Sequence, residues 1–107
     1  MNDKIATLKK YLKDNPDDSF TRFALALELL KQDETDKARK LFEAIRNDDP
    51  DYVGVYYHLG KLYESQDKVD RAIDIYDEGI EVAQEQNEQR TLSELQEAKS
   101  LLKWDDE

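Results

Sequence analysis

The chain has 107 residues, of which 38% are apolar and 39% charged, with three glycines and two prolines. This composition favours one all-α domain and leaves too little turn chemistry for a β-sandwich or barrel. A net charge of −10 disfavours binding to nucleic acid and to anionic membranes, because both need a basic surface. The sequence has no cysteine, no apolar signal core in MNDKIATLKK and no membrane-length apolar run, so we expect a cytoplasmic protein without disulfides or thiolate metal sites.

The N-terminal segment, residues 1–15, is predicted to form a capping helix. One stripe at helical spacing carries Ile5, Leu8, Tyr11 and Leu12, and Asn2 or Asp3 can cap the first turn. Asn15 and Pro16 end the helix, because the residue before a proline disfavours the helical conformation.

The two prolines mark an internal repeat. Pro16 and Pro50 lie 34 residues apart, each in an acidic turn. The same offset aligns small and large residues downstream: Leu25-Ala26 with Leu59-Gly60, Ala38 with Ala72, and Phe42 with Tyr76. Residues 16–49 and 50–87 are therefore predicted to be two repeats, each of two antiparallel helices joined by a short polar turn. The second helix of the second repeat is extended, and residues 88–104 form a C-terminal capping helix before an acidic tail at 105–107.

The second copy carries a recognisable pattern. It reads Tyr56-x-x-Leu59-Gly60-x-x-Tyr63 and then Ala72-x-x-x-Tyr76, which resembles the tetratricopeptide repeat (TPR). The first copy departs from this pattern, with Arg22 at the first aromatic position and Leu29 at the last. The resemblance implies one domain over 1–107 with about six helices in a right-handed solenoid. It also implies a protein or peptide partner, held in a concave groove.

Signatures of catalysis and metal binding are missing from the sequence. His58 is the sole histidine, and we interpret it as a surface residue beside Tyr57, or as a ligand contact. The acidic clusters at 14–18, 48–51 and 105–107 flank helix ends, and we interpret them as helix caps because none has the glycine of a calcium loop. We therefore expect no enzymatic activity, no cofactor and no bound metal.

The helix predicted over residues 19–32 is apolar over more than half of its circumference, which is wider than a surface helix needs. One face packs on the partner helix, and a second face consists of Phe20, Phe23, Leu27 and Leu30. The TPR resemblance implies that this second face lines the groove. In the second repeat the matching positions are polar or aromatic, and with the adjacent histidine they make a candidate contact face of Tyr57, His58, Lys61 and Glu64.

Three things could cover the second apolar face: a partner segment, a second copy of the chain, or the chain's own N-terminal helix. An ordinary half-repeat would stack against Thr21 and Glu28, whose polar side chains are poor packing partners for Leu8 and Leu12. The N-terminal helix could tilt toward Phe20 and Phe23 instead. We expect a protein-interaction module that binds a short helical or extended segment. The alternative is a structural or homo-oligomerising subunit whose face is covered by its own helix or by a second copy.

One kind of ligand is disfavoured by the residues themselves. TPR proteins that grip the acidic C-termini of heat-shock chaperones use a clamp of Lys, Asn and Arg on successive first helices. This chain offers Phe23 and Leu27, then His58, and a last helix containing Arg90. The clamp is absent.

Overall fold

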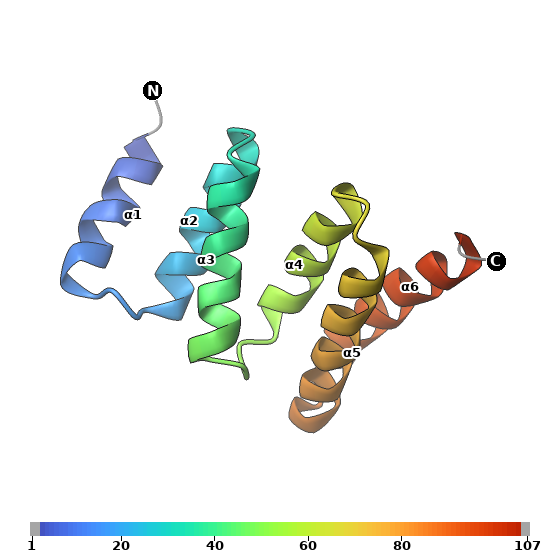
Figure 1. The fold of residues 1–107 in the computed structure, drawn as a ribbon. Coiled ribbons are helices and arrows are strands. Elements are labelled where there is room, and N and C mark those ends of the chain that lie inside the picture. Colours follow the sequence, from blue (N-terminus) through green and yellow to red (C-terminus); the bar gives the residue numbers. More distant parts are fainter. Residues whose placement is uncertain (1–2, 106–107) are drawn as a thin grey trace. The chain divides into compact units, whose positions relative to one another are not determined.

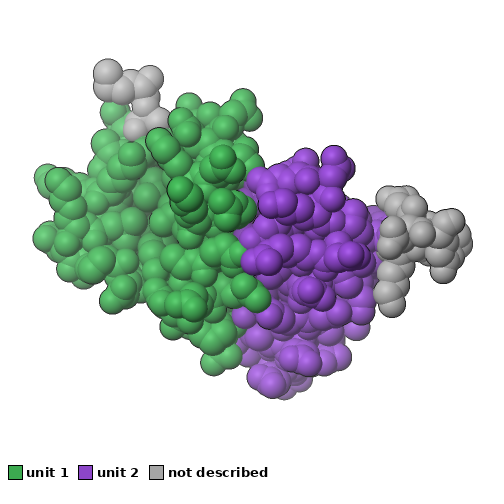
Figure 2. Space-filling view, in the orientation of Figure 1, with its two compact units in different colours: residues 1–52 green, residues 53–107 purple. Residues whose placement is uncertain are grey.

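The computed structural model describes residues 3–105, and every element in that range is α-helical, as the composition predicts. The helices are α1 (Asp3–Asp14), α2 (Ser19–Lys31), α3 (Thr35–Asp48), α4 (Gly54–Ser65), α5 (Val69–Gln86) and α6 (Gln89–Asp105) (Figure 1). They form two compact units, residues 1–52 and 53–107 (Figure 2). The Trp104 side chain and the predicted acidic tail at 105–107 lie outside the part of the chain whose side chains are described.

In unit 1, α2 packs against both α1 and α3. The N-terminus of α2 is fixed by Asp18, whose carboxylate accepts hydrogen bonds from the Thr21 backbone N–H (3.1 Å) and from the Thr21 hydroxyl. This confirms the predicted capping role for the first acidic cluster. The core is made of the small and large residues of the repeat pattern: Leu25, Ala26, Leu29, Ala38, Phe42 and Ile45.

Helix α1 takes the place of an ordinary half-repeat. Lys4 lies 3.7 Å from the Glu28 carboxylate, the Glu28 side chain is 13% exposed, and Thr21 is buried. These residues belong to the polar side of α2 that the sequence analysis judged a poor receiver. Phe20 remains 71% exposed. The prediction that α1 tilts toward Phe20 was therefore wrong: α1 lies on the polar side of α2, where Lys4 pairs with Glu28.

Unit 2 contains α4, α5 and α6, and α5 packs against both of the other helices. Two glycines allow this close packing. A Cβ atom on Gly60 would lie 2.6 Å from Cζ of Tyr76, and one on Gly79 would lie 2.5 Å from Cβ of Tyr56. Helix α6 completes the core through three buried residues at helical spacing, Leu95, Ala98 and Leu102.

The two repeats share a backbone but fill it differently. In both, the turn between the paired helices places an aspartate in the left-handed region, Asp33 at φ 61° and Asp67 at φ 60°. Aspartate tolerates this conformation better than most residues because its short side chain can bond locally. At the 34-residue offset, however, Tyr56 is replaced by Arg22 and Gly79 by Ile45. A tyrosine packed on a glycine in unit 2 thus corresponds to an arginine and an isoleucine in unit 1.

The second acidic cluster does not do what was predicted for it. The N-cap of α4 is Val53, and no side chain accepts a hydrogen bond there. Asp48, at the end of α3, instead pairs with Arg22, with Arg22 Nη1 2.9 Å from Asp48 Oδ2. A buried guanidinium needs an acceptor, and this need outweighs any capping role for Asp48.

Candidate functional site

The predicted apolar face of α2 is present on unit 1 as a partly open stripe. Phe20 is 71% exposed, and Phe23, Leu27 and Leu30 are each half-buried. The Phe23 ring contacts two other rings, and its centroid lies 5.8 Å from that of Phe42 and 5.4 Å from that of Tyr52. Tilted ring pairs at these separations are favourable beyond the area they bury. Phe23 is therefore packed against other aromatic rings, whereas Phe20 is open to solvent.

The four residues predicted from the second repeat are brought together on unit 2. Lys61 Nζ lies 5.6 Å from the ring centroid of Tyr57 and 3.7 Å from the Glu64 carboxylate. The buried Tyr76 hydroxyl also donates a hydrogen bond to Glu64. Burial raises the pKa of Tyr76, and the Glu64 carboxylate raises it further, so this hydroxyl keeps its proton and remains a donor. Glu64 thus has a structural partner, whereas Tyr57 and Lys61 offer a cation and an aromatic edge at the surface.

His58 is half-buried, which differs from the surface position favoured by the sequence. Its ring lies edge-on to that of Tyr57, with centroids 5.7 Å apart. Burial lowers its pKa below 6.5, and the negative charge of Glu94 on α6 opposes part of that change. His58 is accordingly neutral at pH 7.

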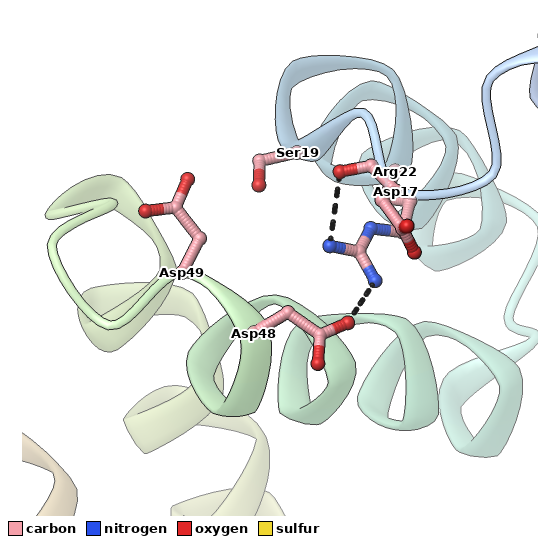
Figure 3. A pocket seen from close by; sticks show the side chains of 5 residues that line it. All are labelled: Asp17, Ser19, Arg22, Asp48 and Asp49. Carbon is pink, nitrogen blue, oxygen red and sulfur yellow. Dashed lines mark hydrogen bonds and ion pairs between the residues drawn. The ribbon is translucent and has the colours of Figure 1, made fainter.

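Sequence reasoning missed a hollow at one end of the α2–α3 pair. It has a volume of about 480 Å³ and is lined by Asp17, Ser19, Arg22, Asp48 and Asp49, as Figure 3 shows. The Arg22 side chain is 7% exposed, and besides Asp48 it donates from Nη2 to the Asp17 carbonyl oxygen at 3.3 Å. The Nε atom of Arg22 is buried without a hydrogen-bond partner. One signal was available: an arginine at an aromatic core position requires carboxylates close by.

The charge in this hollow is unevenly satisfied. Both oxygens of Asp48 are in use, because the Asn47 amide donates to Oδ1 at 3.1 Å while Arg22 takes Oδ2. The hydrogen bond from Arg22 holds the pKa of Asp48 below its usual 3.8. Within the described residues, the carboxylates of Asp17 and Asp49 have no ion pair. The lining therefore carries two negative charges in excess of its one cation.

Tyr52 lies beside the apolar stripe of α2 and near a lining residue of the hollow. Its ring contacts Phe23, and burial raises the pKa of its hydroxyl, with the negative charges of Asp18 and Asp49 raising it further. Asp49 is also a lining residue of the hollow. Acidic and aromatic surfaces thus meet at one end of unit 1.

Two other kinds of site find no support in the described part of the chain. No group of three or more His, Cys, Asp or Glu side chains there is arranged to hold a metal ion. None of the described helices is both long and apolar enough to cross a membrane.

Comparison with known proteins identifies the fold. The tetratricopeptide repeat family model matches residues 29–95. A crystal structure of a tetratricopeptide repeat domain protein from Salinibacter ruber is 58% identical, covers 80% of this chain and 96% of that one, and superposes with a TM-score of 0.78. A solution structure of a tetratricopeptide repeat domain protein from the same organism is 59% identical, covers 81% and 88% of the two chains, and has a TM-score of 0.77.

A more distant structure spans nearly the whole chain. A protein from Bordetella parapertussis is 25% identical, covers 99% of this chain and 92% of that one, and has a TM-score of 0.83. A search of curated proteins gives no significant match. Tetratricopeptide repeats generally mediate protein–protein interactions, and proteins built from them are typically non-catalytic. On this evidence the chain belongs to the tetratricopeptide repeat family.

Proposed function

We propose that this protein is an interaction module that binds a short helical or extended segment of a partner protein through the α2 stripe of unit 1, made of Phe20, Phe23, Leu27 and Leu30. The exposure of Phe20 carries the proposal. A phenylalanine that is 71% exposed, in line with three half-buried apolar residues, gives an apolar patch that a partner can cover with little loss of solvation.

The four residues predicted from the second repeat offer a partner a second kind of contact. Tyr57 and Lys61 on unit 2 present an aromatic surface and a cation, and His58 beside them is a neutral, half-buried side chain at pH 7. An aromatic or carboxylate group on the partner would suit this face. Because each face is small, we expect a dissociation constant on the order of micromolar.

The test compares partner capture by three forms of the full chain, used as bait in lysate of the source cells. Phe20→Ser removes the exposed ring, and Leu101→Ser removes an apolar side chain of similar exposure (56%) on α6. We expect one set of proteins to be captured by the native chain and by Leu101→Ser but lost with Phe20→Ser. Circular dichroism checks that all three are folded. Equal capture by all three forms would contradict the proposal.

A second copy of the chain is the other candidate for covering the stripe. Light scattering across a range of concentrations distinguishes the two cases, since a dimer built on Phe20 should dissociate in the Phe20→Ser variant and a monomer should not change. A dimer abolished by Phe20→Ser would replace the partner-binding proposal with the structural alternative.

A further inference from the structure

The hollow at the end of the α2–α3 pair contains the one buried side-chain donor among the described residues that lacks a hydrogen-bond partner. We propose that the hollow receives the neutral carboxamide of an asparagine or glutamine side chain, from the same partner segment that covers Phe20. This inference rests on the proposed function and specifies the partner: a segment in which a bulky apolar residue is accompanied by an asparagine or a glutamine.

The unpartnered donor is Nε of Arg22. The Arg22 side chain is 7% exposed, and its Nε atom is buried without a hydrogen-bond partner. Nearly all buried polar groups in proteins are bonded, because an unsatisfied donor keeps the full cost of leaving water. Arg22 lines the hollow, so the missing partner is an acceptor that enters there.

Two donors on one edge of the guanidinium can bind that acceptor. Nε and Nη2 point the same way from the planar group, whereas Nη1 lies on the other side and donates to Asp48 at 2.9 Å. Nη2 donates to the Asp17 carbonyl oxygen at 3.3 Å, which is longer than the usual range of about 2.7–3.2 Å. Asp17 is exposed, in the turn before α2 (Figure 3), so an acceptor can approach the Nε–Nη2 edge by displacing this long bond.

The charge of the lining decides which kind of acceptor fits. Asp17, Asp48 and Asp49 line the hollow with a single cation, so a carboxylate or phosphate that enters it would be repelled. A carboxamide is neutral, and it combines an acceptor oxygen with an NH2 group that has two donors. Its oxygen can accept from the Arg22 edge while its NH2 group donates to Asp49, whose carboxylate has no ion pair among the described residues. A hollow of about 480 Å³ has room for such a side chain.

The hollow and the stripe are close enough for one segment to reach both. Ser19, a lining residue, directly precedes Phe20 on α2. Tyr52 contacts Phe23, and the negative charge of Asp49 helps to raise the pKa of the Tyr52 hydroxyl. We therefore expect one short segment to place an apolar side chain on Phe20 and a carboxamide in the hollow.

The experiment titrates ¹⁵N-labelled full-length protein with three blocked dipeptides at pH 7 and follows the arginine Nε–H signals. The probes are acetyl-Phe-Gln-methylamide, its anionic match acetyl-Phe-Glu-methylamide and its apolar match acetyl-Phe-Met-methylamide. We expect the glutamine probe to shift the Nε–H signal of Arg22 and to leave those of the other arginines in place, which are Arg39, Arg46, Arg71 and Arg90. It should bind about fivefold more tightly than the methionine probe, as one net hydrogen bond gives, and the glutamate probe should bind least.

One variant tests the guanidinium edge itself. Arg22→Lys keeps the positive charge beside Asp48 but has no Nε–H group. We expect it to reduce the preference for glutamine over methionine to about one, while Arg39→Lys, the same change on α3, leaves that preference intact. Circular dichroism checks that both variants are folded, and if Arg22→Lys is not, the titration of the native chain decides alone.

The proposal is overturned if the glutamine probe leaves the Arg22 Nε–H signal unshifted, or if the methionine or glutamate probe binds as tightly. Partner capture that is lost with Phe20→Ser but retained in a folded Arg22→Lys variant would refute the carboxamide inference and leave the proposed function standing.

Discussion

Replacing Gly79 with alanine should destabilise unit 2, although alanine is the better helix former. The added Cβ would lie 2.5 Å from Cβ of Tyr56 and 3.0 Å from Cδ1 of Leu95, against an ordinary carbon–carbon contact of about 3.5–4.0 Å. Leucine can rotate away, but Tyr56 Cβ is attached directly to the α4 backbone, so α4 and α5 must separate. Because the clash is with an atom attached to the backbone, we place the overpacking cost at about 2–3 kcal/mol, the upper part of its usual range of roughly 1–3 kcal/mol. The helix preference returns about 1 kcal/mol, so we expect a net loss of about 1–2 kcal/mol.

Urea unfolding followed by circular dichroism measures this change in the free energy of unfolding. The control is Glu81, an exposed residue near the middle of α5, where the difference between Glu81→Ala and Glu81→Gly gives the helix preference without any clash. If Gly79→Ala proves as stable as the native chain, or more stable by the amount measured at position 81, then α4 and α5 are not as closely packed as described and the reasoning fails.

Three further predictions concern charge and backbone. NMR titration should give His58 a pKa below 6.5, and the pKa should fall further in Glu94→Gln. Because the pKa of His58 is lower in the folded than in the unfolded state, the stability linked to this residue is fully present above pH 6.5 and is lost as the pH falls through the folded-state pKa. The pKa of Asp48, measured from its carboxyl chemical shift, should lie below 3.8 and rise toward that value in Arg22→Leu. The stability linked to Asp48 is therefore present above pH 3.8 and lost on acidification, which acid unfolding will measure. In the turn after α2, urea unfolding should find Asp33→Gly more stable than Asp33→Ala by about 1 kcal/mol, because only glycine adopts φ near 61° without a Cβ penalty; equal stability of the two would argue against the left-handed turn.

Much of the fold could be predicted because the repeat pattern indicates which residues pack against one another. Small residues such as Ala26 and Gly60 recur at a fixed offset from large ones, and the prolines mark where helices end. The last helix was predicted over residues 88–104, and the structure buries Leu95, Ala98 and Leu102 on it. The position of α1 was harder to predict, because it lies on a polar side of α2 and helical periodicity carries no information on contacts between residues distant in sequence, such as Lys4 and Glu28.

The hollow could not be predicted for a related reason. An arginine at an aromatic core position was visible in the sequence, but whether Arg22 is buried or extends into solvent depends on where the end of α3 lies. The acidic residues near it were interpreted by their distance from helix ends, a rule that was right for Asp18 and wrong for Asp48. That the α2 stripe forms the binding site remains a prediction.

The residues that differ between the repeats, Tyr56 and Gly79 in the second and Arg22 and Ile45 in the first, bear on how the chain avoids misfolding. Two sections with the same backbone could in principle pair a helix of one with a helix of the other. Helix α4 placed on α3 would bring Tyr56 against Ile45 in place of Gly79, and α2 placed on α5 would separate the buried Arg22 from its partner Asp48. At these positions each helix therefore fits its own partner better than the matching helix of the other repeat, which disfavours swapped pairings of the duplicated backbone during folding.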